Sequence, residues 1–285
     1  MKISSKHLIG GVLIGLILIF ASIFSLSDGK LHLVFCDVGQ GDAIYIKAAT
    51  GDDILIDGGP NEKVLSCLGK HMPFYDRTIE LIILSHPQAD HLTGLISVIE
   101  RYNVKYFVSS GIGNETEGYK RLENLIKTKT IDRKTLFSGE GINLDGLALK
   151  TIWPKEEVLG ASTSETELNS LSLVLQLSYG NFDALLPGDA GAPVLEELAL
   201  SLPTAGEWEV LKVPHHGSKT SLLESFLETV KPQLAIISVG KNSYGHPAKE
   251  ILKLLSDRAI KILRTDEDGE IEIVSDGKGW YTKAK

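Results

Sequence analysis

Short apolar runs that end in acidic or histidine-containing turns limit the fold of this chain more than any other feature. The pattern recurs in FCDVGQGD, LIDGG, ILSHPQADH, LLPGDA, LKVPHHGS and SVGKNSYGHP. Short apolar runs bounded by glycine-rich turns are typical of buried β-strands. Because the loops that leave the strands of an α/β protein converge at one edge, the polar side chains of these turns are predicted to meet in space.

The alternation of strand-like and helix-like stretches predicts a layered α/β protein with two covered sheets. The predicted helices are 61–72, 92–102, 117–128, 219–230 and 247–256. The predicted strands are 31–38, 43–49, 53–59, 79–85, 105–110, 134–137, 147–153, 171–178, 182–187, 207–214, 233–240, 260–265 and 270–274. The polar stretch 155–168 is expected to be an exposed loop.

The N-terminal segment has a different character. Residues 8–26 carry no charge, and Lys2 and Lys6 precede them. An apolar helix of this length, at about 1.5 Å per residue, spans a hydrocarbon core of about 30 Å. We therefore expect residues 1–27 to be a single transmembrane anchor, with 28–285 as an extracytoplasmic domain. A cleaved signal peptide is the alternative, and it would make the protein secreted.

Charge and cysteine content restrict the function less. The formal net charge of −8 argues against a surface that coats polyanions, but a dinuclear metal site would add about four positive charges where a phosphate binds. Cys36 and Cys67 are too few for a disulfide framework and lie in apolar contexts. We expect both to be buried free thiols.

Histidine and carboxylate side chains together are the ligands of zinc, manganese or iron. Five of the eight histidines fall in the turns described above: His86, His91, His215, His216 and His246. Simpler interpretations stay open at this point. Asp90 or Ser85 could cap a helix that begins at residue 92, Asp189 could cap one that begins at Gly191, and His246 could be a turn residue before a helix that opens with Pro247.

The motifs DVGQGD, LIDGG, PHHGS and YGHP, in this order, resemble the soluble hydrolase domain of ComEC-type competence proteins. That domain is a branch of the metallo-β-lactamase superfamily, and the likeness runs over about residues 31–275. The resemblance implies a four-layer αββα sandwich. It also implies one or two divalent metal ions, zinc or manganese, in the cleft between the sheets.

The resemblance also assigns roles to residues of this chain. The implied metal ligands are His86, Asp90, His91, Asp189, His215 and His216, and the choice between the last two stays open. Asp189 would bridge two metals, and Asp57 would orient a ligand histidine. With Asp90 and Asp57, His246 completes the catalytic set as a metal ligand, a phosphate contact or a leaving-group acid.

Further polar residues of the same turns are assigned supporting roles. The predicted substrate contacts are Asn169, Ser170, Ser218, Asn242 and Tyr244. Asp37 is expected near the metals, and Asp42 is expected to cap its glycine turn. Gln88 stands where the signature H-x-H-x-D-H has its second histidine, and residues 92–188 contain no histidine. We therefore predict one firmly bound metal and one weak metal on the His86 side.

The features of the turns predict a metallohydrolase, and the resemblance implies phosphodiester hydrolysis of DNA at the outer face of the membrane as the first hypothesis. A separate DNA-uptake channel is the expected partner, and the oligomeric state stays open. Two alternatives are kept. One is hydrolysis of a cell-wall phosphodiester, a lactone or a β-lactam. The other is a metal-poor binding module of a DNA-uptake or envelope complex, which Gln88 favours.

Overall fold

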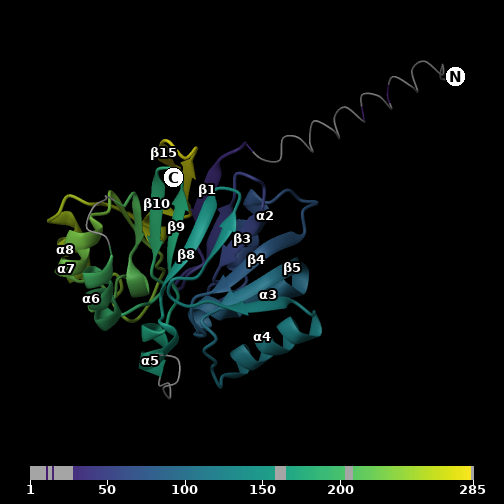
Figure 1. Ribbon diagram of the computed structural model, residues 1–285, viewed down its shortest axis with the longest axis horizontal. Coiled ribbons are helices and arrows are strands. Elements are labelled where there is room, and N and C mark those ends of the chain that lie inside the picture. The colour runs from purple at the N-terminus through teal and green to yellow at the C-terminus, as the bar shows by residue number, and fades with distance from the viewer. Residues whose placement is uncertain (1–10, 12–14, 16–27, 158–164, 203–207, 284–285) are drawn as a thin grey trace, which may run out of the picture.

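The computed structural model describes residues 28–157, 165–202 and 208–283, together with Gly11 and Gly15 (Figure 1). Two β-sheets pack face to face, and helices cover the outer face of each sheet. The arrangement is the predicted αββα sandwich. One half of the molecule is built from the first part of the chain together with the last two strands, and the other half is built from the segment between them.

The first sheet has the strand order β15-β14-β1-β2-β3-β4-β5-β6. Its strands are β1 (Leu31–Phe35), β2 (Ile44–Lys47), β3 (Asp53–Ile56), β4 (Thr78–Leu84), β5 (Asn103–Ser109), β6 (Asp132–Thr135), β14 (Ile271–Ser275) and β15 (Trp280–Lys283). Helices α2 (Lys63–His71), α3 (Ala89–Arg101) and α4 (Glu117–Thr128) lie on its outer face.

The second sheet has the strand order β13-β12-β11-β10-β9-β8-β7. Its strands are β7 (Gly141–Leu144), β8 (Leu147–Trp153), β9 (Val174–Tyr179), β10 (Phe182–Leu186), β11 (Val210–Lys212), β12 (Leu234–Ile237) and β13 (Lys261–Arg264). The helices of this half are α5 (Glu165–Ser170), α6 (Ala192–Ser201), α7 (Glu224–Val230), α8 (Lys249–Ser256) and the short α9 (Thr265–Asp268). The sequence did not predict β7, β15, α5 or α9, and it offered a helix from Gly191, where α6 lies, only as an alternative.

Strand β4 shows why the sheets are covered on both faces. Leu81 and Ile83 face the core between the sheets, whereas Ile82 and Leu84 face the core under the helices. Successive side chains of a strand point to opposite faces, so a strand with apolar residues on both faces requires a layer on each side. The prediction that this strand is covered on both faces is confirmed.

Helix α3 begins at Ala89, three residues before the predicted start. Asp90 and His91 therefore lie in its first turn, where the helix axis fixes their direction. The N-cap is Gln88, without a side-chain capping bond, so the interpretation of Asp90 or Ser85 as the cap is wrong. Helix α6 likewise has Gly191 at its N-cap and no side-chain cap, so the capping interpretation of Asp189 is wrong as well.

The expectation of two free thiols is also wrong. Cys36, directly after β1, forms a disulfide with Cys67 of α2. The two cysteines are 31 residues apart in the sequence, and only the packing of α2 on the first sheet brings their Cα atoms to 5.8 Å. That separation lies within the range that a disulfide bridges.

The predicted anchor over residues 8–26 lies outside the described residues, apart from Gly11 and Gly15. Within the described ranges, no helix combines the length and the apolar character needed to cross a bilayer. Residues 158–164 of the predicted exposed loop are likewise outside the described part of the chain.

Candidate metal centre

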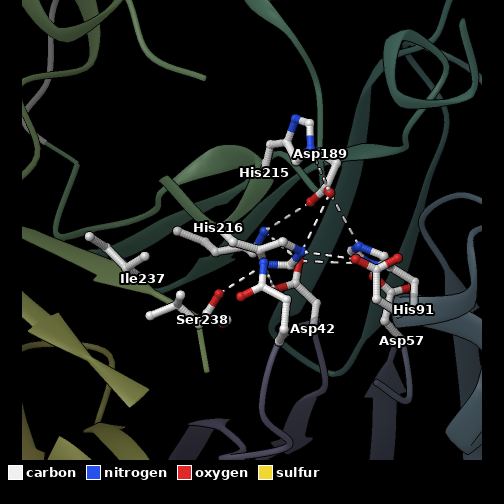
Figure 2. Close-up of polar contacts among 12 residues, drawn as sticks. Asp42, Asp57, His91, Asp189, His215, His216, Ile237 and Ser238 are labelled. Atoms are coloured by element: carbon white, nitrogen blue, oxygen red, sulfur yellow. Dashed lines mark hydrogen bonds and ion pairs between the residues drawn. The ribbon is translucent and has the colours of Figure 1, made fainter. Parts of the chain in front are cut away.

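The polar turns singled out in the sequence meet at one edge of the two sheets, as predicted. Asp57 follows β3, His86 follows β4, Asp189 follows β10, His216 follows β11 and Ser238 follows β12. Figure 2 shows side chains from both halves of the molecule directed toward one another, among them those of His91, Asp189 and His216. The edge of the sandwich therefore gathers residues that are up to 181 positions apart in the chain.

Four side chains converge most closely: Asp90, His91, Asp189 and His216 place one donor atom each within 4.8 Å of the others. Oδ2 of Asp189 lies 3.4 Å from Nε2 of His91 and 3.5 Å from Nε2 of His216. Nε2 of His216 lies 3.4 Å from Oδ2 of Asp90. We call these four residues the metal cluster.

These separations fit a shared cation better than direct hydrogen bonds. A charge-assisted N–H···O bond has a length of about 2.7–2.9 Å. Two ligands held about 2.1 Å from a zinc ion at the tetrahedral angle lie about 3.4 Å apart. Nε2 of His91, Nε2 of His216 and both carboxylate oxygens of Asp189 are buried without a hydrogen-bond partner among the described residues. The donor set therefore fits a divalent metal ion.

Hydrogen bonds on the far side of each ring fix the two imidazoles of the cluster. Nδ1 of His91 donates to Oδ2 of Asp57 at 2.9 Å, and Nδ1 of His216 donates to the carbonyl of Ser238 at 2.8 Å (Figure 2). In the neutral form of each ring, the proton lies on Nδ1 and the lone pair of Nε2 points into the cluster. Such partners are what a metal-binding histidine requires. Asp57 thus orients His91, as the sequence predicted.

Backbone strain directs His216 into the cluster. His215 and His216 both have positive φ values, of 48° and 52°. Each non-glycine residue in this region costs about 1–3 kcal/mol, which the surrounding structure must offset. The turn places His216 fully inside and leaves the side chain of His215 34% exposed, with its Nε2 4.0 Å from Asp189. Between the two histidines that the sequence left open, the geometry favours His216 as the ligand.

Asp37 and Asp42 differ in their surroundings. Asp37 is exposed, and its carboxylate accepts a hydrogen bond from Gly39 N–H in its own turn. It is not among the side chains that converge, and the expectation that it lies near the metals remains a prediction. Asp42 is buried, and Oδ1 lies 3.5 Å from Nδ1 of His216. The turn that carries Asp42 packs closely against the backbone of Asp90. Gly41 allows this packing, because a Cβ at that position would lie 2.2 Å from the carbonyl oxygen of Asp90.

His86 and Gln88 form the other side of the centre. His86 is buried, and its ring centroid lies 4.1 Å from that of His91. Nε2 of His86 lies 3.2 Å from Oε1 of Gln88, and Nδ1 lies 3.0 Å from the hydroxyl of Ser85. His86 is close to the metal cluster, but it does not join the group whose donor atoms converge.

The two sides differ in charge as well as in contacts. Burial and the neighbouring His91 lower the pKa of His86 to about 4, so its ring is neutral at pH 7. Burial also opposes charge on His91, yet the carboxylates of Asp189 and Asp57 raise its pKa well above the ordinary value. His216 and His91 hold the pKa of Asp189 well below its usual range against the opposing effect of burial. The metal cluster therefore has strong charge complementarity without a metal.

The predicted substrate contacts lie at or near this edge, with different surroundings. The amide of Asn242 donates to the carbonyls of Gly240 and His246 and accepts from Tyr244 N–H and His246 N–H. Asn242 therefore shapes the loop, and its predicted role as a substrate contact remains a prediction. The loop presents the exposed ring of Tyr244, whose centroid lies 5.6 Å from that of His246. The ring of His246 lies 5.7 Å from that of His215.

For the three other predicted substrate contacts, the structure shows the surroundings but no contact with the metal cluster. Asn169 and Ser170 end α5, and the carbonyl of Ser170 accepts a hydrogen bond from the indole of Trp153. The hydroxyl of Ser218 is buried without a hydrogen-bond partner in the described residues. A substrate role for these three side chains remains a prediction.

Sequence reasoning missed two residues of the centre. Ser85 donates its hydroxyl to Asp57 at 2.6 Å and its backbone N–H to the same carboxylate at 2.8 Å. Lys212 is fully buried, forms an ion pair with Asp42 and donates to the carbonyl of Gly188 at 2.9 Å. A lysine inside an apolar strand, as in LKVPHHGS, was the available signal, because a charge is buried only with a partner.

A second group with metal-ligand residue types, Cys67, His71 and Glu270, has a different character. The sulfur of Cys67 is bonded to Cys36, and Glu270 forms ion pairs with Lys70 and His71. Its donor atoms are therefore already used.

Comparison with known proteins supports the architecture. Residues 36–241 match the Metallo-beta-lactamase superfamily. ComE operon protein 3 of Bacillus subtilis is 29% identical over 265 residues, which cover 86% of this chain and 33% of that protein. Recombination protein 2 of Haemophilus influenzae is 30% identical over 242 residues, which cover 83% of this chain and 28% of that protein. The chain thus spans about a third of the length of these relatives, and the predicted resemblance to competence-type proteins is confirmed.

A solved structure shows the same fold. Igni18, a metallo hydrolase from the archaeon Ignicoccus hospitalis, superposes with a TM-score of 0.56 over 88% of this chain and 98% of that one. The sequence identity is 15%, so the likeness concerns the fold alone.

Proposed function

The chain belongs to the metallo-beta-lactamase superfamily, and on that premise we propose that it is a metal-dependent phosphodiesterase that cleaves DNA. The observation that carries the proposal is the convergence of Asp90, His91, Asp189 and His216, whose N···O distances of 3.4–3.5 Å match ligands around one cation. In this proposal these four residues hold a zinc or manganese ion. A divalent cation held there supplies Lewis-acid catalysis for hydrolysis of a phosphodiester.

The side chains around the cluster have distinct tasks in this proposal. Asp57 holds the Nδ1 proton of His91, and the Ser238 carbonyl holds that of His216, so both rings keep one orientation during the reaction. His86 stays neutral at pH 7 and completes a weaker second metal site together with Gln88. Burial and the neighbouring His215 lower the pKa of His246, so its neutral ring can contact the phosphate from the rim.

The choice of DNA rests on the relatives. One is named a ComE operon protein and another a recombination protein. Both match this chain over only about a third of their length, so the substrate of the whole relative enters here as a proposal. The net charge of −8 is compatible with it, since cations bound at the centre would attract the phosphate.

The place of action belongs to the same proposal. The uncharged residues 8–26 behind Lys2 and Lys6 have the composition of a membrane anchor, which would place the hydrolase domain on the outer face beside a DNA-uptake channel. Protease protection of intact cells and of spheroplasts tests this topology. A hydrolase domain accessible only after lysis would contradict it.

The full chain, purified in a mild detergent, tests the activity. We expect it to cleave labelled single-stranded DNA and a chromogenic phosphodiester with manganese or zinc, and to lose both activities with a chelator. The variants Asp90→Ala and His216→Ala should fold and lose turnover, whereas Asp132→Ala, an exposed residue on β6, should retain it. Turnover of a β-lactam or lactone without phosphodiester cleavage would overturn the substrate class, and DNA binding without any turnover would overturn the enzyme.

A further inference from the structure

Lys212 lies in the centre but has no role in the proposed reaction. It ends β11, and its side chain is fully buried. Lysine is almost never fully buried without a charged partner, because its ammonium group loses its hydration. Among the buried residues that the structure describes, it is the only lysine or arginine. Its position in the centre therefore requires an explanation.

The ammonium group of Lys212 has three oxygen neighbours. It forms a close ion pair with Oδ2 of Asp42, donates to the carbonyl of Gly188 at 2.9 Å, and lies 3.7 Å from Oδ1 of Asp189. The other oxygen of Asp189, Oδ2, faces His91 and His216. The two oxygens of this carboxylate are thus divided between an ammonium group on one side and the metal cluster on the other.

The charges of the centre also show how Lys212 affects the number of metal ions that the centre can hold. Asp42, Asp57, Asp90 and Asp189 carry four negative charges, and Lys212 carries one positive charge. With neutral imidazoles, one divalent cation leaves a single negative charge in this buried region, and a second divalent cation would leave it positive. Without Lys212, two divalent cations would neutralise the four carboxylates. In a poorly hydrated site such a difference has a large effect on binding.

We propose that Lys212 is a built-in cation that limits this centre to one tightly bound divalent metal ion and reserves Oδ2 of Asp189 for that ion. The inference rests on the proposed function for the existence of the metal site. It differs from the sequence-based expectation, in which Asp189 bridges two metals. Lys212 acts through Asp42 and Asp189, so it is a positioning residue.

Manganese binding to the full chain tests the proposal without measuring activity. After saturation with manganese and removal of the unbound ion, electron paramagnetic resonance of the wild-type protein should show one tightly bound ion with an isolated six-line spectrum. Lys212→Met removes the charge and keeps an unbranched side chain. It should bind a second ion at least tenfold more tightly than the wild type does, with the exchange-coupled spectrum of two ions about 3.5–4 Å apart.

Two further variants serve as controls. Lys212→Arg keeps a cation and should keep the single-ion spectrum, which a merely structural role for the lysine would not require. Lys219→Met makes the same change at an exposed lysine seven positions on, and it should behave as the wild type does. Circular dichroism and thermal unfolding verify that each variant folds.

The outcomes separate this inference from the proposed function. A wild-type protein that binds no manganese would overturn both. A wild-type protein with two tightly bound, coupled ions would overturn the role of Lys212 alone, even if Lys212→Met failed to fold. One ion with unchanged affinity in both the wild type and Lys212→Met would also overturn it.

Discussion

The two sides of the centre use the same residue types for different results. On one side, His91 and His216 each bond through Nδ1 to a fixed acceptor, which leaves Nε2 free to meet Asp189. On the other side, His86 has Gln88 at one nitrogen and Ser85 at the other. Nε2 of His91 and Nε2 of His216 are therefore free to bind a metal, whereas Nε2 of His86 shares its position with the amide of Gln88, as a weaker site would.

Replacing Asp189 should have the largest effect on this difference. Oδ2 of Asp189 faces both imidazoles of the cluster, so Asp189→Ala removes the carboxylate that the two rings share. We expect tight zinc binding to weaken by more than about 100-fold, beyond the loss caused by a change around the ligands. Competition with a chromogenic chelator measures the affinity, with Asp132→Ala as the control. Full metal retention in Asp189→Ala would contradict the assigned cluster.

A change behind the ligand should have a smaller effect. Asp57→Asn keeps the shape of the side chain but weakens the hold on the Nδ1 proton of His91. We expect zinc affinity to fall by about 10–100-fold. Asp37→Asn makes the same change at the exposed carboxylate of the nearby glycine turn and should leave affinity unchanged. Equal losses in the two variants would mean that the effect is not specific to His91.

The next test gives the His86 side of the centre a second imidazole, as the side with His91 and His216 already has. Gln88→His supplies an imidazole where Nε2 of His86 now meets an amide oxygen. We expect bound zinc to rise above one ion per chain at a fewfold excess of metal, because imidazole is the stronger ligand, while Lys212 keeps the second ion more weakly bound than the first. Elemental analysis after gel filtration gives the ratio, and Gln233→His, at an exposed position before β12, controls for added histidine. An unchanged ratio would place Gln88 outside the ligand set.

The smallest expected effect is a difference in protonation in the chelator-treated protein. Burial and His91 lower the pKa of His86 to about 4, whereas Asp189 and Asp57 raise that of His91 despite its burial. At pH 6 we expect a neutral His86 and a cationic His91 in imidazole nitrogen NMR spectra. Identical titration of the two rings would remove the electrostatic difference between the sides.

The pKa shifts of His91 and His86 also determine how the stability of the metal-free fold changes with pH. His91 binds its proton more tightly in the folded state, so its contribution is complete below about pH 6.5 and is lost as pH rises through the raised pKa. His86 binds its proton less tightly when folded, so it destabilises the fold as pH falls from about 6.5 toward 4. Urea unfolding of the metal-free chain, repeated at several pH values, should detect both changes in the free energy of unfolding. Loss of one change in His86→Gln and of the other in His91→Gln would assign each change to its histidine.

Local pattern was sufficient for the strands and for the residue types at their ends. The run over 79–85 has apolar residues on both faces of the strand, which requires a layer on each face, and β4 has both layers. The residue types in the motifs at 86–91, 189 and 215–216 likewise indicated metal ligands without knowledge of the fold. Strands β7 and β15 were missed because their sequences are weakly periodic or exposed, so neighbouring elements decide their conformation.

What the sequence by itself determined is the layered fold and the set of acidic and imidazole groups that follow its strands. Only the tertiary structure decided which of them share a site: His216 rather than His215, Asp42 rather than Asp37, and Lys212 as the buried cation. It also decided that Cys36 and Cys67 are bonded. The physical reason is that burial, ion pairing and disulfide formation depend on distances between distant segments, whereas sequence pattern reports only on near neighbours.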